Sequence, residues 1–288
     1  ANFIDTALMH FPFTDANQNN TAITGNIGMA YNGANGLRVT FGVSSGFRAP
    51  NVDDLTKVFD TRTGYVVVPN KDLKPEYTYN SELNISKTTE KYSIGTSVFF
   101  TRFSNALVVD KFKWNNASTI LYQGIMSDVY AMQNKAIANV YGFNINGSAN
   151  LSSNTILAAT YSYTKGRYTN KDLNGVNAEK PLDHIPPTYG RVGLKHNVKK
   201  MTYELFTVFN GWKHIEDYNL NGEDNEIYAT KDGMPGWQIW NINTSYQPTK
   251  KLNLSFQIEN IADLNYRYFA SGISALGRNY VVQAKYIF

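Results

Sequence analysis

The sequence predicts an all-β protein, a transmembrane antiparallel β-barrel, and three observations support this fold class. Apolar and polar side chains alternate with a period of two in many segments of the chain. No apolar run approaches the roughly 18 residues of a membrane-spanning helix, and the mean hydropathy is negative. Tyr, Phe and Trp together make up 14% of the residues, which suits the aromatic girdles of a barrel wall.

The predicted strands present one apolar face and one small or polar face. Between Leu37 and Phe47 the odd positions are apolar, apart from Ser45, and the even positions carry Arg, Thr, Gly and Ser. We count about eleven such strands. In chain order they are Ile23 to Tyr31, Leu37 to Phe47, Tyr77 to Ile85, Tyr92 to Phe103, Ile137 to Leu151, Leu157 to Tyr163, Thr188 to His196, Thr202 to Trp212, Trp237 to Gln247, Leu252 to Glu259 and the last strand within Gly277 to Phe288.

The connections between these strands alternate in length. Short turns are predicted at 32–36, 87–90, 152–154, 198–200 and 248–250, and long connections at 48–74, 104–136, 164–187, 213–236 and 262–277. Consecutive strands are therefore antiparallel, with tight turns on one rim and long loops on the other, which faces outward in outer-membrane barrels. Ala1 to Phe13 is the end of a further strand or a loop, and its pattern leaves both open.

Composition helps to decide between a membrane wall and a soluble β-sandwich or solenoid, which also alternate apolar and polar residues. The polar faces here carry mostly Asn, Ser, Thr, Gly and Gln instead of Lys, Glu and Arg, which favours a wall between lipid and a wet lumen. The net charge of +4 is too small and too scattered to predict nucleic-acid binding. With no Cys there is no disulfide framework, and no signal-peptide pattern begins at Ala1.

Four motifs, in this order and spacing, resemble a known family. They are Gly46 to Asn51 (GFRAPN), Pro69 to Glu76 (PNKDLKPE), Asn260 to Asp263 (NIAD) and the closing strand that starts at Gly277 (GRNY) and ends at Phe288. Together they resemble the carboxy-terminal barrel of a TonB-dependent outer-membrane receptor. For Phe47 and Arg48, and for the prolines of the first two motifs, a structural role in the girdle or at strand ends is also consistent with the residue types.

The resemblance implies a barrel of about 22 strands that holds an amino-terminal plug, with uptake powered through TonB. Because the chain has about half of these strands and no recognisable plug or TonB box, we expect residues 1–288 to be the carboxy-terminal half of the barrel domain. The expected partners are outer-membrane lipid, the remaining amino-terminal strands and plug of the same receptor, the TonB complex and a small-molecule chelate.

The sequence predicts no catalytic residue, no cofactor and no metal site. The four histidines have no metal-binding spacing, and Asp183 and His184, being adjacent on an extended chain, point to opposite sides. The segment from Asp217 to Gly222 matches the beginning of a calcium loop, but Tyr228 stands where a bidentate Glu is required. An acidic, solvated turn is the simpler interpretation of this segment.

The long loops combine aromatic and cationic side chains, which suits a bulky, often anionic metal chelate, although loop packing uses the same residues. The candidate ligand-binding residues are Arg62, Tyr65, Trp114, Tyr122, Tyr130, His214, Tyr218, Arg267 and Tyr268. Haem receptors of the family carry a His between the first two motifs, whereas Asn51 to Val68 contains none. This ranks a siderophore-type iron chelate above haem, with cobalamin and oligosaccharides left open.

Two rival functions remain beside active import of a scarce nutrient. A self-contained passive pore or adhesin would share the barrel pattern but would need neither a plug nor TonB. An outer-membrane hydrolase would need loop residues whose replacement abolishes turnover without unfolding the barrel.

Overall fold

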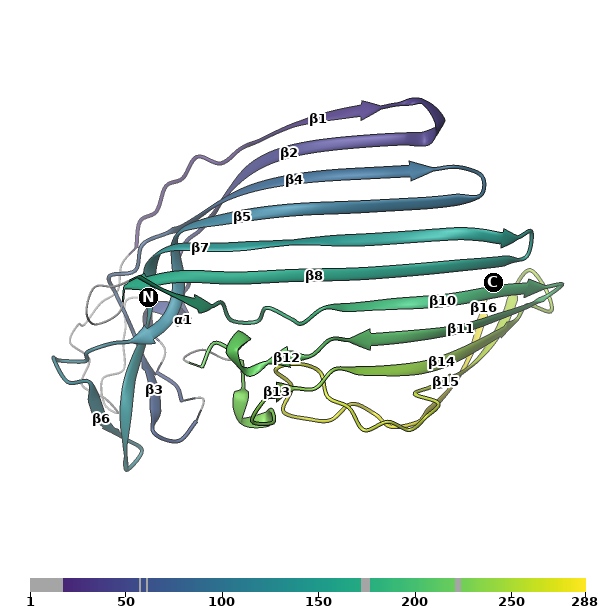
Figure 1. Cartoon of the computed structure of the whole chain (residues 1–288). Coiled ribbons are helices and arrows are strands. Elements are labelled where there is room, and N and C mark those ends of the chain that lie inside the picture. The colour runs from purple at the N-terminus through teal and green to yellow at the C-terminus, as the bar shows by residue number, and fades with distance from the viewer. Residues whose placement is uncertain (1–17, 57, 61, 172–176, 221–223) are drawn as a thin grey trace.

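The computed structural model describes residues 18–56, 58–60, 62–171, 177–220 and 224–288. The expectation for Ala1 to Phe13 lies outside these residues. A fourteen-stranded sheet dominates the fold, and its main path has the order β1-β2-β4-β5-β7-β8-β10-β11-β14-β15-β16 (Figure 1). These strands are β1 (Asn26–Asn32), β2 (Leu37–Arg48), β4 (Glu76–Thr88), β5 (Tyr92–Lys111), β7 (Ile125–Ser152), β8 (Thr155–Lys171), β10 (Tyr189–Val198), β11 (Met201–Asn210), β14 (Trp237–Tyr246), β15 (Leu252–Glu259) and β16 (Asn279–Tyr286).

Smaller elements gather at the end of the sheet where the long connections lie. Strands β3 (Tyr65–Val68) and β6 (Thr119–Tyr122) pair with β7, and β9 (Asn177–Pro181) pairs with β8. A separate two-stranded sheet joins β12 (Lys213–His214) to β13 (Gly233–Met234). The short helices at this end are α1 (Val52–Thr56), η2 (Ile215–Asp217) and η3 (Glu226–Tyr228), whereas η1 (Ala34–Gly36) lies at the opposite end, in the short turn between β1 and β2. No helix in the described part of the chain has the length and apolar character to span a membrane.

Each strand of the main path runs antiparallel to its neighbours, and the predicted strands correspond one to one with it. The register explains why the sheet has an apolar face. Phe41 is paired with Leu83, Leu83 with Val98, and Val98 with Phe143, so apolar residues of successive strands share one side. Because side chains alternate along a strand, a shift by one residue would send this whole set to the other face.

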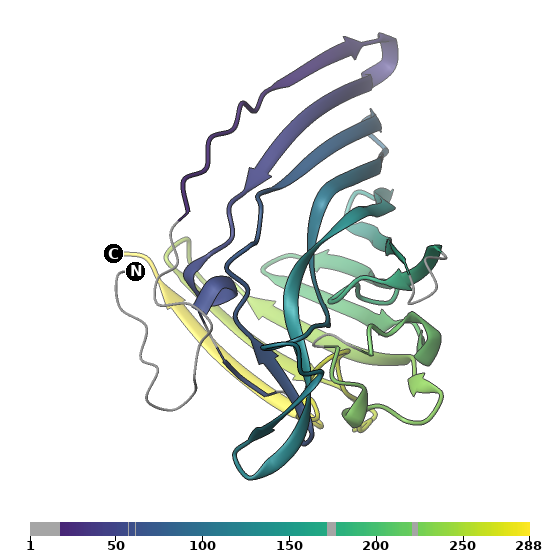
Figure 2. The ribbon, with the colours of Figure 1, turned by 90° about the vertical axis from the view of Figure 1, so that its left-hand side faces the viewer.

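The apolar face is exposed, as a lipid-facing wall requires. On β15, Leu254 and Phe256 keep 40% and 43% of their surface, and Val98 on β5 keeps 50%. The opposite face carries polar side chains that bond across neighbouring strands: the Ser97 hydroxyl donates to Glu82 (3.0 Å). The chain is therefore a curved portion of a transmembrane β-barrel wall (Figure 2).

The long connection predicted at 104–136 is mostly strand, which corrects its assignment as a loop. Strand β5 continues to Lys111, and β7 already begins at Ile125. The alternation fades in this segment because other elements cover both faces: Ala106, Val108 and Ala138 pack with Tyr168 in one cluster, while Val109 packs in another. The core of the molecule thus lies in the loop layer at the strand ends.

Candidate functional site

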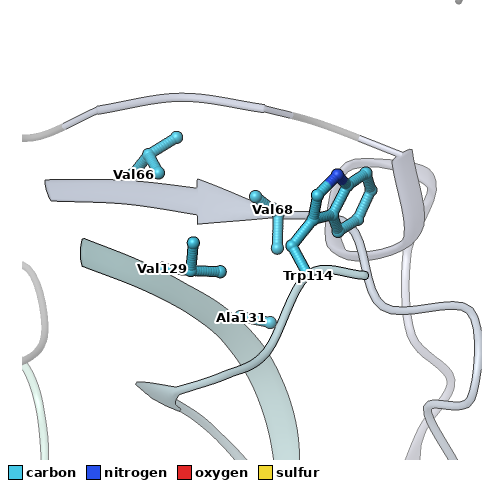
Figure 3. Packing of buried hydrophobic residues seen from close by; sticks show 5 residues of the cluster. All are labelled: Val66, Val68, Trp114, Val129 and Ala131. Atoms are coloured by element: carbon cyan, nitrogen blue, oxygen red, sulfur yellow. The ribbon is translucent and has the colours of Figure 1, made fainter. Parts of the chain in front are cut away.

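A first group of predicted site residues lies in a compact unit built from β3, β6 and the start of β7. Trp114 packs with Val66 and Val68 of β3 and with Val129 and Ala131 of β7 (Figure 3). Tyr122 packs against the same cluster. These side chains are shielded because β3, β6 and the start of β7 come together around them.

The rings of Tyr65 and Tyr130 stack on each other in this unit, with centroids 4.1 Å apart. They are 3% and 4% exposed, and Trp114 is 5% exposed. Burial is also the largest cause that raises the pKa of Tyr130 above its ordinary value. In this structure these three aromatic side chains pack the loop layer and expose little surface to a ligand.

Arg62 links this unit to a loop that is distant in the sequence. Its guanidinium forms an ion pair with Glu226 in η3, donates to the carbonyl of Leu220 (3.0 Å) and lies 4.9 Å from the centre of the Tyr65 ring. Strand β2, which leads into the loop of Arg62, and strand β11, which leads into the loop of Glu226, are far apart in the strand order. The contact therefore joins two loops that rise from well-separated parts of the wall.

The family-like motifs have structural partners in the loop layer. Asn51 and Asp54 cap α1 reciprocally: the Asp54 N–H donates to the Asn51 side chain (2.8 Å), and the Asn51 N–H donates to the Asp54 carboxylate (3.0 Å). Arg48 adds an ion pair to the same carboxylate (2.9 Å). Asn70 donates to the carbonyl of Met132 (2.9 Å), which fastens the second motif to β7.

The third motif closes the last long loop at its base. Asn260 is 1% exposed, and its side chain accepts from the Leu264 N–H (2.9 Å) while donating to the carbonyls of Leu264 (2.8 Å) and Leu276 (3.3 Å). Asp263 accepts from the Arg278 N–H (2.6 Å). The first set of bonds satisfies the buried side chain of Asn260, and together with the exposed bond to Asp263 it joins the two ends of the loop where the chain leaves β15 and returns to β16.

A second group of predicted site residues lies around β12 and the last long loop. Tyr218 is 3% exposed, and its ring meets Phe269 edge-on at 5.4 Å. The buried ammonium of Lys213 lies 4.7 Å from the Phe269 ring and donates to the carbonyl of Ile185 (2.6 Å). His214 is exposed and stacks on Trp212 with ring centroids 5.6 Å apart.

Asp224 is the buried anion of this second group, with an exposed fraction of 0%. Its carboxylate accepts from the backbone N–H groups of His184 (2.7 Å) and Asn219 (2.8 Å). Burial raises the pKa of the Asp224 carboxyl, while those bonds and the Lys213 charge act in the opposite direction. Burial likewise lowers the pKa of Lys213. Asp224 and Lys213 together fasten the connections before β10 and after β12 to each other.

The calcium-like segment from Asp217 to Gly222 is only partly within the described residues, which omit 221–223. Asp217 forms an ion pair with Arg167, and Asp224 is occupied with backbone N–H groups. Among the residues that the structure describes, no group of three or more His, Asp or Glu side chains is placed to hold a metal ion.

Two cavities meet at Trp237, the first residue of β14. One has a volume of about 350 Å³ and is lined by Tyr228, Tyr266 and Arg267; the other, of about 230 Å³, is lined by Tyr189, Phe209 and Tyr268. Trp237 lines both. Its ring contacts Tyr266 (4.4 Å) and Tyr268 (4.9 Å, edge-on), and its indole N–H donates to the carbonyl of Arg267 (3.0 Å).

The structure thus divides the predicted site residues into three classes. Tyr65, Trp114, Tyr130 and Tyr218 are buried, and Arg62 is engaged with another loop. Tyr122, His214, Arg267 and Tyr268 keep partial or full exposure, and only Arg267 and Tyr268 line a cavity at Trp237. Sequence reasoning missed Trp237 because its place at the start of a strand is typical of a girdle residue. No signal in the sequence places Trp237 beside Tyr266 and Tyr268, because these contacts join segments that are far apart along the chain.

Comparison with known proteins gives a family match that covers most of the chain. Residues 3–261 match the family model described as TonB dependent receptor-like, beta-barrel. Among curated relatives, hemoglobin and hemoglobin-haptoglobin-binding protein A of Haemophilus influenzae is 27% identical in an alignment of 257 residues that covers 81% of this chain and 22% of that protein. The iron-regulated outer membrane virulence protein of Vibrio cholerae is 23% identical in an alignment of 243 residues that covers 83% of this chain and 35% of that protein.

Solved structures with the same fold include the copper transporter OprC, with a TM-score of 0.72 and 17% identity over 92% of this chain and 39% of that one. The ferric enterobactin receptor PfeA of Pseudomonas aeruginosa has a TM-score of 0.69 and 16% identity, over 91% of this chain and 40% of that one. The chain therefore spans between about a fifth and two fifths of the length of these proteins.

Proposed function

The chain belongs to the TonB-dependent receptor family as a portion of its β-barrel, and we propose that it serves in active import of a bulky iron chelate. Members of this family are transport receptors of the Gram-negative outer membrane, which the chain crosses repeatedly with its strands. We further propose that residues 1–288 are the carboxy-terminal half of the barrel domain. The remaining strands, the plug and the TonB complex would then be partners, and the chain itself would perform no catalysis.

The observation that carries this proposal is the placement of the aromatic and cationic loop layer. Figure 1 shows α1, β3, β6 and β12 of this layer beyond one end of the long strands. The inner face of those strands is polar, as the bonds from Ser97 to Glu82 and from Thr101 to Asn80 indicate. A ligand held there would sit above a wet lumen, and loops on a rigid wall are where binding residues can vary without disturbing the fold. Of the predicted site residues, we propose direct ligand contact for Tyr122, His214, Arg267 and Tyr268.

Arg62, Tyr65, Trp114, Tyr130 and Tyr218 are proposed to act at the same mouth by shaping and holding it. Their burial or ion pairing fixes the loops that carry the exposed residues. Replacing one of them would then change ligand affinity together with loop order, whereas replacing an exposed residue would change affinity alone.

A siderophore-type chelate remains the first candidate, because Asn51 to Val68 contains no His. Haem is the second candidate, and the names of the Haemophilus influenzae relatives favour it. The two candidates share iron as the nutrient. They differ in whether the iron arrives in a small chelate or within a porphyrin.

Uptake of labelled iron by cells that carry the whole receptor tests the proposal. We expect uptake that stops when TonB is deleted and when the proton gradient is collapsed, because active import requires both. Uptake that continues unchanged in either case would establish a passive pore. Surface binding without uptake in any condition would favour an adhesin.

A further inference from the structure

We propose that the two cavities beside Trp237 form one binding site for an aromatic group that carries a negative charge. The site rests on the proposed function, since the group would belong to the imported chelate. The cavities are called the cationic lobe (about 350 Å³) and the aromatic lobe (about 230 Å³). The cationic lobe is within the range of about 300–1,000 Å³ that is usual for ligand pockets.

The cationic lobe has an excess of positive charge. Arg267 is the one lining residue that is ionised at neutral pH in the part of the chain that the structure describes, and no carboxylate lines the lobe. Tyr266 adds no charge at neutral pH, and burial raises its pKa further, to about 12. The Arg267 guanidinium donates to the carbonyl of Tyr228 (3.1 Å), which leaves further N–H donors for an anion.

The aromatic lobe has the opposite character. Its lining has no ionised side chain among the described residues. Five of its lining residues are aromatic: Tyr189, Phe209, Trp237, Tyr268 and Phe269. Such a lining favours a flat ring, which gains offset-stacked or edge-on contacts worth more than its buried area alone.

Trp237 lines both lobes, and neighbouring groups fix the position of its own side chain. It is 8% exposed, its indole N–H is bonded to the Arg267 carbonyl, and Tyr266 and Tyr268 pack against its ring. The same backbone segment therefore carries both the cation and the aromatic contacts. Tyr228 and Tyr268 remain 44% and 50% exposed, so surface for ligand contact is present at each lobe.

Two other cavities of the loop layer differ in charge. One of about 130 Å³ is lined by Lys165, Arg167 and Lys213 together with Asp217, and Arg167 is paired with that carboxylate. Another, of about 290 Å³, is lined by Arg48 together with Glu76 and Asp183. Both mix charges of opposite sign. The excess positive charge beside uncharged aromatic surface at Trp237 is what selects an aromatic anion over a neutral aliphatic chelate.

Equilibrium binding to the purified whole receptor tests this site with three probes. The ferric complex of 2,3-dihydroxybenzoate and hemin are both aromatic and anionic, and ferrichrome is a hydroxamate chelate without an aromatic ring. The variants are Arg267→Gln, Arg267→Lys and Trp237→Phe. Lys231→Gln is the matched control, because it removes an exposed cation from the loop before β14 without touching either lobe.

We expect at least one aromatic probe to bind more tightly than ferrichrome. Arg267→Gln should weaken that binding by roughly 10- to 100-fold, which is the loss of affinity that corresponds to the usual free energy of a hydrogen bond to a charged group. Arg267→Lys should recover part of the loss, Trp237→Phe should weaken binding less than Arg267→Gln, and Lys231→Gln should have no effect. Whichever of the two aromatic probes binds more tightly shows whether the site prefers a catecholate or a porphyrin.

The inference is overturned if neither aromatic probe binds, if ferrichrome binds as tightly, or if Arg267→Gln and Lys231→Gln behave alike. Circular dichroism and loop proteolysis of each variant show whether a loss reflects an unfolded loop. Failure here is separable from failure of the import proposal. A receptor that imports iron through TonB but binds ferrichrome best would refute the aromatic site and leave import standing.

Discussion

At the scale of single residues, the buried carboxyl group of Asp224 leads us to predict that the stability of the loops depends on pH. Burial raises its pKa above the ordinary 3.8, so the folded loops hold the proton to a higher pH than the unfolded chain does. The stability that this carboxyl contributes is therefore full below about pH 3.8 and is lost as pH rises through the folded-state pKa. We expect the connections before β10 and after β12 to become easier to cleave by a protease over that interval.

Two variants isolate this carboxyl from its neighbours. Asp224→Asn keeps the side-chain shape and should flatten the pH dependence of the cleavage rate. His184→Gln removes a ring whose Nδ1 lies 4.0 Å from the Asp224 carboxylate, and so tests whether the histidine side chain contributes to the effect. A pH dependence that disappears with His184→Gln and survives Asp224→Asn would assign the effect to the histidine.

Residue types in the loops were predictable from the sequence, whereas their partners were not. The sequence indicates that Tyr65 and Trp114 belong to aromatic loops, but their burial depends on β3 reaching β7, which is a parallel pairing between distant segments. The place of Trp237 in the candidate site likewise depends on its ring contacts with Tyr266 and Tyr268, which lie about thirty residues further along the chain. Periodicity reports which face a residue occupies and carries no information about such contacts.

At the scale of elements, β15 gives a direct test of the wall. Leu254 lies on the exposed apolar face, and Ser255 lies on the opposite face, where its hydroxyl is near the side chain of Gln283. Leu254→Arg should lower the free energy of unfolding by about 2–4 kcal/mol if the position is near the bilayer midplane, whereas Ser255→Arg should cost far less. Denaturant titration of the whole receptor in lipid measures both, and equal losses would contradict the assigned faces.

The loop contact between Arg62 and Glu226 makes a second prediction at this scale. We expect Arg62→Gln and Glu226→Gln to loosen both loops, with a coupling free energy of about 1 kcal/mol in a double-mutant cycle. Joining loops from distant parts of the wall should also slow ligand entry, so each single variant should raise the association rate. Loop proteolysis and stopped-flow binding provide the two measurements.

The charge-reversed pair Arg62→Glu with Glu226→Arg is the control for that cycle. It should restore much of the protection that each single reversal removes. A coupling free energy indistinguishable from zero would mean that the two loops are held by other contacts, such as the bond from Arg62 to the carbonyl of Leu220.

The strands of the wall were predictable because a lipid-facing surface imposes strict alternation on them. The prediction failed where that constraint ends. In β5 and β7 the strands continue into the loop layer, where Val108 and Val109 are both buried although they point to opposite sides. Alternation is lost there because neither face meets lipid, so a sequence pattern built on alternation ends β5 too early and begins β7 too late.

At the scale of the whole molecule, the sheet has two edges. Within the described residues, β1 pairs only with β2 and β16 only with β15 (Figure 2). A backbone group left without a partner in lipid costs several kcal/mol, so two open edges are incompatible with stable insertion. Further strands of the receptor are expected to complete the ring, with β16 joined to its first strand.

Because the chain has no Cys, introduced cysteines report this closure cleanly. Met29→Cys on β1 and Val282→Cys on β16 both lie on the exposed apolar face. We expect residues 1–288 produced alone in lipid vesicles to stay open to protease and to form no cross-link between these positions. The same residues within the whole receptor should be protected, with the thiol introduced by Val282→Cys close to the first strand of the receptor. An efficient cross-link between positions 29 and 282 in the isolated chain would mean that eleven strands close a ring by themselves, and the proposal of a half barrel would fail.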